Sequence, residues 1–383
     1  MKVSISVGGR FWAFFLAQQL LRYNLLDKLI TSYPTFEVKK YGIPTVKVYS
    51  IIEKELLQRA WSLFPQQIKY YFDPQPLIHE IYDWRASQIE IDSDILDVWS
   101  SFGLRTLRKA KEKGTVVILE RGSSHIRYAA KIYEEEYDRI GQRVLPIHKN
   151  IIEKECCEYE EADYISIPST FVKESFLEYG VPAAKLLQTP YGVDLNNFKK
   201  VPKKDDIFRI IFVGGMTIRK GVHYLLQAFS ELKLPDSELL LVGSINDEIK
   251  PFFKKYEGNF KWIGNVPERE LYKYYSQSSL FVIMSIEEGL ALVQVQAMAC
   301  GLPIICTTNT GGEDLIREGI EGFVINIRDV ESLKEQIVYL YNNPGICKEM
   351  GQAALERAKT GFTWDDYGEK IINTYHNVLG AKE

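Results

Sequence analysis

Glu288 lies at a predicted strand-to-helix turn whose residues suit the binding of both an anion and sugar hydroxyls. The apolar run 280–283 predicts a buried strand, and apolar positions recur at helical spacing over 292–299, shortly after Gly289. The start of a helix at a glycine turn presents unpaired N–H groups and a partial positive charge to a phosphate. A carboxylate there cannot help to hold phosphate, but it can accept hydrogen bonds from sugar hydroxyls. The pattern therefore indicates a nucleotide-sugar site, with an ordinary βαβ turn as the alternative.

Arg219 and Lys220 form a second candidate anion site. They follow the apolar run 210–213 and two glycines that end at Gly215, and a helix is predicted from about residue 222 to 232. An arginine offers a planar fork of donors and a lysine offers a point charge, so the two together suit a pyrophosphate. A solvated basic turn is the alternative interpretation.

Gly9 and His125 mark two more positions where chemistry is expected. Each follows a predicted strand, over 2–7 and 115–119, and ligands of open α/β sheets bind beyond the carboxyl ends of the strands. The glycine turn at Gly9 is not a GxGxxG dinucleotide fingerprint, and a tight turn packed under a helix explains it equally well. His125 is one of only five histidines, and a helix cap is the alternative for it.

Apolar strands alternate with helices through both halves of the chain, which predicts α/β domains with doubly wound parallel sheets. Strands are expected at 2–7, 29–31, 46–48, 95–99, 115–119, 164–169, 210–213, 239–242, 260–263, 280–283, 304–306 and 323–325. A chain of 383 residues exceeds the size at which one core usually stops growing, so two domains are expected. The charged segment 199–206 is the predicted linker between a domain of residues 1–200 and a domain of residues 205–362.

Composition argues against several classes of function. The net charge of −4 gives no overall electrostatic attraction to nucleic acid. Five cysteines without metal-like spacing argue against a zinc site and a disulfide framework, which fits a reducing, cytosolic compartment. Met1 leads directly into a predicted strand, so no signal peptide is expected, and no apolar run approaches the ~20 residues that cross a bilayer. The Asp92-Ser93-Asp94 segment has the form of a metal-binding DxD, but so short a pattern is common by chance.

The segment 52–90 is predicted to be rich in helices and holds a concentration of aromatic side chains. These are Trp61, Phe64, Tyr70, Tyr71, Phe72, Tyr82 and Trp84. Such a segment could form a surface that contacts an acceptor or a membrane, and simple packing between helices is the alternative. Peripheral contact of a cytoplasmic protein with the inner face of the membrane is therefore left open.

Residues 284–312 resemble the signature of the family-4 retaining glycosyltransferases, which have the two-Rossmann fold called GT-B. In that signature a Glu, seven residues and a second Glu precede an AMACGxPVI-like run and a GG pair. Glu288 matches the first Glu, the run QAMACGLPII matches closely, and Gln296 replaces the second Glu. The segments ERGSSHIR, EEEYDRIG and YGVD are also similar to the family. The family's Lys corresponds to Lys220, whereas its partner Arg is replaced by Gly215.

This resemblance implies a GT-B glycosyltransferase with its active site in the cleft between the domains. We expect it to move a hexose-type sugar from a UDP-, GDP- or ADP-sugar to a hydroxyl of a glycan, lipid-linked or small-molecule acceptor. The resemblance also implies a retaining transferase that depends on neither a metal nor a cofactor. By resemblance, Lys220 and Arg219 neutralise the phosphates, Glu288 orients the sugar, Gln296 holds the ribose and His125 shapes the acceptor side. His125, Glu288 and Lys220 are the expected catalytic residues. The other implied donor-binding residues are Gly9, Gly215, Gly289, Leu290, Ala291 and Leu292.

Two other functions remain open at this point. A nucleotide-sugar epimerase of the same fold would change a sugar stereocentre without an acceptor. A non-catalytic nucleotide-sugar-binding protein would explain the departures at Gln296 and Gly215. In either case the segment 363–383 resembles the family's terminal helix, which crosses back onto the first domain.

Overall fold

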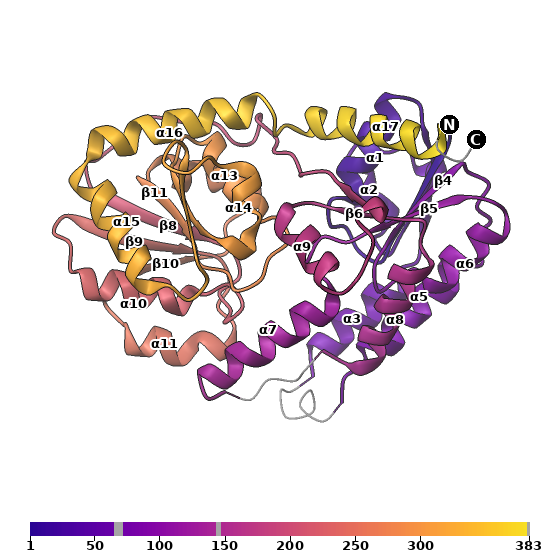
Figure 1. Cartoon of the computed structure of the whole chain (residues 1–383), viewed down its shortest axis with the longest axis horizontal. Coiled ribbons are helices and arrows are strands. Elements are labelled where there is room, and N and C mark those ends of the chain that lie inside the picture. Colours follow the sequence, from indigo (N-terminus) through magenta and orange to yellow (C-terminus); the bar gives the residue numbers. More distant parts are fainter. Residues whose placement is uncertain (65–71, 143–146, 381–383) are drawn as a thin grey trace.

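The computed structural model describes residues 1–64, 72–142 and 147–380. They form two α/β domains that lie side by side, each built on a parallel sheet with helices on its faces (Figure 1). The first sheet has seven strands in the order β3-β2-β1-β4-β5-β6-β7, and the second has six in the order β10-β9-β8-β11-β12-β13. The predicted fold class is therefore confirmed.

The first domain alternates strands and helices along the chain. Its strands are β1 (Val3–Val7), β2 (Leu26–Thr31), β3 (Val48–Ser50), β4 (Ile95–Trp99), β5 (Val116–Glu120), β6 (Tyr164–Ile167) and β7 (Leu186–Gln188). Its described helices are α1 (Ala13–Arg22), α2 (Thr35–Lys39), α3 (Glu53–Ser62), α5 (Gln75–Ala86), α6 (Leu104–Glu112), α7 (Ile126–Arg139), α8 (Lys149–Glu161) and α9 (Thr170–Glu178). Short 3₁₀ turns lie at Thr45–Lys47 and Ala183–Lys185.

The second domain repeats this pattern. Its strands are β8 (Phe208–Val213), β9 (Ser237–Val242), β10 (Lys261–Gly264), β11 (Leu280–Ile283), β12 (Ile304–Thr307) and β13 (Gly322–Ile325). Its helices are α10 (Val222–Leu232), α11 (Lys250–Lys255), α12 (Leu271–Ser276), α13 (Leu292–Ala299), α14 (Gly312–Leu315), α15 (Val330–Asn342) and α16 (Pro344–Lys359). Three 3₁₀ turns lie at Asp247–Ile249, Glu268–Glu270 and Thr308–Thr310.

The central strands explain where the two candidate sites lie. Every residue of β4, β5, β11 and β12 is buried, because helices cover both faces of a parallel sheet. The strand order reverses at β1 in the first sheet and at β8 in the second, which are the topological switch points of doubly wound sheets. Gly9 follows β1 and Gly215 follows β8, so both glycine turns lie where such sheets bind ligands.

Helix α17 (Trp364–Gly380) leaves the second domain and lies against α1 of the first (Figure 1). Trp364 stacks on Phe15 with 4.3 Å between ring centroids, and the Tyr375 hydroxyl donates to Asp97 Oδ2 at 2.5 Å. The sheets fall on either side of the segment 199–206. The domain limits at residues 200 and 205 themselves stay a prediction.

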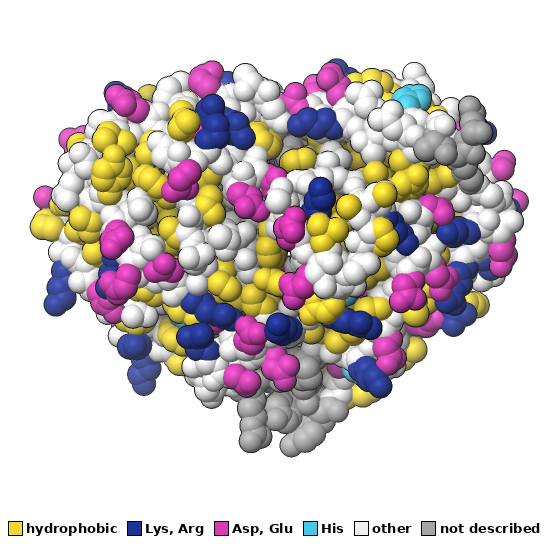
Figure 2. All heavy atoms as spheres, in the orientation of Figure 1, with side chains coloured by type: hydrophobic (Ala, Val, Ile, Leu, Met, Phe, Trp, Pro, Cys, Tyr) yellow, Lys and Arg dark blue, Asp and Glu magenta, His cyan; other side chains and the backbone are white. Residues whose placement is uncertain are grey.

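The aromatic segment 52–90 is only partly packed. Tyr82 is fully buried and donates to the Ile30 carbonyl at 3.1 Å, whereas Phe64 and Trp84 are exposed. Tyr70 and Tyr71 lie outside the described residues. Among the helices that the structure describes, none has both the length and the apolar character needed to cross a membrane. On the face shown in Figure 2, basic side chains are interspersed with acidic ones.

Candidate active site

Arg219, Lys220 and Glu288 form an ion cluster between the turn after β8 and the turn after β11. Lys220 Nζ and Arg219 Nη1 both contact Glu288 Oε2, the latter at 3.0 Å. Arg219 Nη1 also donates to the Glu287 carbonyl at 2.8 Å. The structure therefore brings the predicted cations and the predicted sugar-binding carboxylate into direct contact.

Backbone packing fixes the position of this cluster. Gly221 has a φ of +63°, and a Cβ there would lie 1.8 Å from the Met284 carbonyl oxygen. Only glycine permits this close approach, in a conformation that other residues rarely adopt. The Ile286 amide donates to the Arg219 carbonyl at 2.8 Å. The two turns are thus held together by main-chain contacts, independently of the charged side chains.

The cluster has unusual electrostatics. Burial lowers the pKa of Lys220, and the neighbouring Arg219 adds to this effect, while Glu288 opposes it. The Lys220 and Glu288 side chains are 17% and 18% exposed, so the cluster is reachable from solvent only in part. An entering phosphate would meet two cations that share one carboxylate oxygen of Glu288.

Glu287 is a functional candidate that sequence reasoning missed. Its carboxylate is fully buried and crosses to the first domain, where Ser123 Oγ, the Ser124 amide and Tyr133 Oη donate to it at 2.5, 3.0 and 2.6 Å. Burial disfavours its charge, but Arg219 and these donors outweigh burial and lower the pKa of Glu287. The available signal was a serine pair and an acidic pair, each placed just after a buried strand.

Helix α13 begins beside the cluster without a side-chain cap. The Gly289 carbonyl accepts from Ser169 Oγ of the first domain at 2.6 Å, and a Cβ on Gly289 would lie 1.8 Å from the Gly122 carbonyl oxygen. Leu290 and Ala291 are buried in this turn, and the Ala291 amide donates to the Thr310 carbonyl at 3.3 Å. The glycine therefore allows the loops of the two domains to touch at the start of α13.

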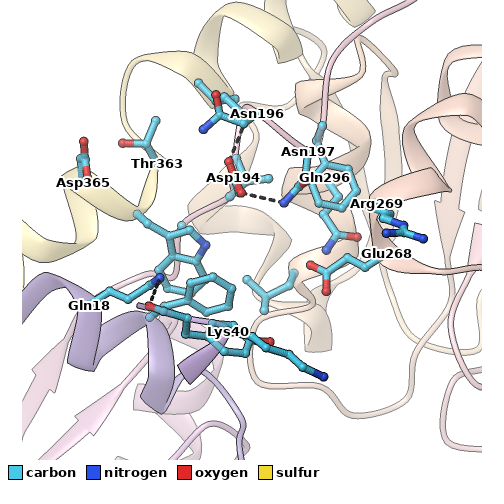
Figure 3. A pocket seen from close by; sticks show the side chains of 18 of the residues that line it. Gln18, Lys40, Asp194, Asn196, Asn197, Glu268, Arg269, Gln296, Thr363 and Asp365 are labelled. Carbon is cyan, nitrogen blue, oxygen red and sulfur yellow. Dashed lines mark hydrogen bonds between the residues drawn. The ribbon is translucent and has the colours of Figure 1, made fainter. Parts of the chain in front are cut away.

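A cavity of about 1000 Å³ lies between the two domains, next to helix α13. Leu292 and Gln296 line it from α13, and Gln296 Oε1 accepts from the Tyr275 hydroxyl at 3.2 Å. Figure 3 shows polar side chains from both domains and from the connecting segments around this cavity, among them Gln18, Lys40, Asp194, Asn196, Asn197, Glu268, Arg269, Thr363 and Asp365. Carboxylates, amides and cations are side chains that can bind the hydroxyls and phosphates of a nucleotide sugar.

Residues 194–357 match the family model described as "Glycosyl transferases group 1". These residues make up less than half of the chain, and over them the chain is similar to this family. Among curated relatives, it is 27% identical over 186 residues to CapM, the capsular polysaccharide biosynthesis glycosyltransferase of Staphylococcus aureus. That alignment covers 47% of this chain and 48% of CapM, so the chain spans about half the length of this relative.

Two solved structures share the two-domain GT-B fold of this chain over nearly its whole length. The sucrose-phosphate synthase of Thermosynechococcus elongatus has a TM-score of 0.73 at 18% identity and covers 99% of both chains. Anabaena HepE in complex with UDP has a TM-score of 0.72 at 15% identity, covering 98% of this chain and 100% of HepE. At these identities the similarity shows the fold alone.

His125 lies in an aromatic environment in the first domain. It caps α7, where its Nδ1 accepts from the Arg127 amide at 3.2 Å, and its ring stacks on Tyr179 at 4.5 Å. Burial, with the nearby Arg121 and Arg127, lowers the pKa of His125 to about 4. The imidazole is therefore neutral at pH 7. Among the described contacts, none joins His125 to the ion cluster. Its catalytic role stays a prediction.

The remaining predicted donor residues lie at the switch points. The Gly9 carbonyl accepts from Thr31 Oγ1 at 2.9 Å, and a Cβ on Gly215 would approach Ser244 Oγ at 3.7 Å. The position that corresponds to the family's arginine thus has room for a side chain that this chain lacks. Within the described part of the chain, no three His, Cys, Asp or Glu side chains gather into a metal site. Independence from metal and cofactor stays a prediction.

Proposed function

We propose that the protein is a retaining, metal-independent glycosyltransferase that moves a hexose-type sugar from a nucleoside-diphosphate sugar to an acceptor hydroxyl. The observation that carries this proposal is the contact of Arg219 and Lys220 with Glu288 at the start of α13. The contact brings together two cations that can bind the diphosphate of such a donor and a carboxylate that can accept hydrogen bonds from the hydroxyls of its sugar. The UDP bound in the HepE structure supports the same donor chemistry.

Donor binding rearranges this cluster in our proposal. The diphosphate takes the place of Glu288 as the acceptor for Arg219 and Lys220, and the first-turn amides of α13 add further donors. Glu288 is then free to accept from the sugar hydroxyls. Gln296 binds the ribose in the cavity, where its Oε1 can accept and its amide nitrogen can donate.

The proposed transfer occurs on one face of the sugar. The acceptor oxygen bonds to the anomeric carbon on the side from which the diphosphate leaves, so the configuration is retained. The bond between that carbon and the phosphate oxygen breaks, and the acceptor proton passes to the leaving phosphate. Arg219 and Lys220 stabilise the negative charge that develops on the diphosphate.

The acceptor side of the proposal includes a membrane or lipid-linked partner. Leu56 and Leu63 project from or just beyond α3, and they are 60% and 86% exposed. Phe64 and Phe72 are also exposed. An apolar surface of this kind supports contact with a lipid-linked acceptor, and a sedimentation assay with vesicles would test it.

Glu288→Gln tests the proposed function. Loss of a charge-assisted hydrogen bond of up to about 3 kcal/mol predicts a fall in turnover on the order of 100-fold, with the fold retained. Glu335→Gln is the matched control, because Glu335 is an exposed carboxylate of α15 far along the chain from the cluster. Turnover is measured with radiolabelled UDP-, GDP- and ADP-sugars. Wild-type turnover in the Glu288 variant would refute the assignment.

The same assay separates the alternative functions. Slow hydrolysis of one donor favours a transferase, and a changed sugar stereocentre without acceptor favours an epimerase. Absence of binding to any nucleotide sugar would indicate a protein that has lost the site. Thermal shifts with UDP, GDP and ADP identify the base, because a ligand at 100 times its Kd stabilises by about 2.7 kcal/mol.

A further inference from the structure

Among the side chains of helix α7 that contact the second domain, three lie close to the turn of Arg219 and Lys220. Tyr133, Glu136 and Tyr137 are spaced three and four residues apart, so they lie on one face of the helix. In Figure 1, α7 runs along the junction of the domains and its C-terminal end approaches α11. The partners of these three side chains flank or face one short turn of the second domain, the one that holds Arg219 and Lys220.

The first contact reaches the turn from its N-terminal side. The Tyr137 hydroxyl donates to Glu248 Oε2, and the other oxygen of Glu248 accepts from the Ile218 amide at 3.0 Å. Ile218 directly precedes Arg219, and its carbonyl accepts from the Gly221 amide at 2.9 Å. Glu248 therefore joins α7 to the main chain of the turn that presents the two cations.

The second contact reaches the turn from its C-terminal side. Glu136 is buried and accepts from His223 Nε2 at 3.1 Å and from the Tyr224 hydroxyl at 2.7 Å. Arg328 Nε donates to the same carboxylate at 2.6 Å. Burial disfavours the charge of Glu136, but these three donors outweigh it and lower its pKa. His223 and Tyr224 open α10, two and three residues after Gly221.

The third contact acts across the cluster. The Tyr133 hydroxyl donates to Glu287 Oε2 at 2.6 Å, and the Glu287 carbonyl accepts from Arg219 Nη1 at 2.8 Å. One face of α7 thus reaches Ile218 through Glu248, and it contacts the residues after the turn and the loop that faces it directly.

We propose that α7 positions the donor-phosphate turn, so that Tyr133, Glu136 and Tyr137 are positioning residues for the Arg219–Lys220 pair. This inference rests on the proposed function, because it concerns the same donor site. Its consequence is that affinity for the diphosphate depends on a helix of the other domain. A merely structural contact between the domains would instead change stability and leave the preference for diphosphate untouched.

The test compares binding of UDP, GDP and ADP with binding of UMP, GMP and AMP by calorimetry, using the full chain. In Tyr137→Phe we expect the best nucleoside diphosphate to bind about 3–10-fold more weakly, the range for one hydrogen bond. The matching monophosphate should lose less, because it places fewer oxygens on the turn. Tyr339→Phe is the matched control, since within the described residues the ring of this exposed tyrosine of α15 contacts Phe323 and its hydroxyl makes no hydrogen bond.

Two further pairs keep the test independent of folding defects. Glu248→Gln retains a carbonyl oxygen for the Ile218 amide, so it should bind diphosphate better than Glu248→Ala. Glu136→Gln should weaken diphosphate binding, whereas Glu134→Gln, an exposed neighbour on α7, should not. Thermal melts confirm that each variant is folded.

The outcomes separate the two proposals. Equal loss for diphosphate and monophosphate, or no loss in any α7 variant, would overturn the positioning role while leaving the proposed function in place. A wild-type chain that binds none of the six nucleotides would overturn both. A selective loss for diphosphate in the α7 and Glu248 variants alone supports the inference.

Discussion

Two adjacent carboxylates, Glu287 and Glu288, have different partners and therefore different chemistry. Glu287 is surrounded by donors from the first domain and is fully buried. Among the described residues, the Glu288 carboxylate contacts Arg219 and Lys220 of its own domain and remains partly exposed. A buried, fully paired carboxylate fixes structure, whereas a partly exposed one can exchange its partners for a ligand. Substitution of Glu287 should accordingly affect mainly stability, whereas substitution of Glu288 should affect mainly ligand binding.

The lowered pKa of His125 predicts how the stability of the protein depends on pH. Its pKa is about 4 in the folded chain against an ordinary 6.5, so the unfolded chain takes up the proton first as pH falls. The free energy of unfolding should therefore decrease as pH falls from about 6.5 to about 4. His125→Asn retains a good capping side chain but removes this titration, so its stability should decrease less over that window.

Urea unfolding at pH 7 and pH 5 measures this difference. The informative quantity is the change between the two pH values in each protein, because lost stacking on Tyr179 also lowers the stability of the variant at pH 7. The same change in both proteins would show that His125 does not titrate as expected.

The conformation of the turn before α10 depends on Gly221. Gly221→Ala would force a left-handed backbone onto alanine and place its Cβ against the Met284 carbonyl. The backbone strain alone costs on the order of 1–3 kcal/mol, and the clash adds to it. We expect a clear loss of stability together with weaker nucleoside-diphosphate binding, because Arg219 and Lys220 lie in the displaced turn.

Gly258→Ala is the control for backbone strain. Gly258 also has a left-handed φ, of +86°, but a Cβ there meets no atom within 4 Å. It should therefore lose stability through strain only and bind nucleotide normally. Denaturation and calorimetry on both variants give the comparison. Equal losses of stability in the two variants would mean that the contact of residue 221 with Met284 relaxes without added cost. That result would contradict the close packing described for this turn.

The whole molecule is held together at several points where the domains meet. Besides α7, Asp314 of the second domain accepts from the Thr170 amide and hydroxyl of the first, both at 2.7 Å. Ser169 bonds to Gly289 next to it, and α17 docks on α1. The site loops of the second domain are thus built against the first domain.

Tyr375→Phe tests the docking of α17. It would leave Asp97, a fully buried carboxyl with one oxygen already unpaired, without its hydroxyl donor. We expect the free energy of unfolding to fall by about 1–3 kcal/mol, the usual cost of an unsatisfied buried polar group. A double-mutant cycle with Asp97→Ala, which removes the acceptor, should show coupling between the two positions, with Tyr339→Phe as control. Additive effects would show that the hydrogen bond contributes nothing of its own.

Sequence patterns predicted the sheets well because buried parallel strands are continuous apolar runs. The run 280–283 coincides with β11, and Arg219, Lys220 and Glu288 meet because both turns follow strands of one sheet. The expected strand at 46–48 is wrong in part. Residues Thr45–Lys47 form a 3₁₀ turn after Pro44, whose fixed φ favours a turn, and β3 starts only at Val48.

The contacts between domains could not be predicted from the sequence. Glu287 bonds to residues more than 150 positions away, and no periodicity records which surfaces of two domains will meet. For the same reason, no pattern around Glu136 and Tyr137 indicates their partners in the second domain. His125 was predicted from its place after a strand, but its aromatic neighbours come from α8 and α9. The domain-to-domain docking, and not local propensity, decides these environments.

The return of α17 to the first domain has a consequence for synthesis. Asp97 and Tyr375 are 278 residues apart, so the ribosome must complete the entire second domain before this contact can form. Until then, the face of α1 that holds Phe15 has no Trp364 to stack on. Domains generally fold as the chain emerges, but this one lacks part of its covering until late. During translation, that apolar face is therefore open to chaperones and to premature association.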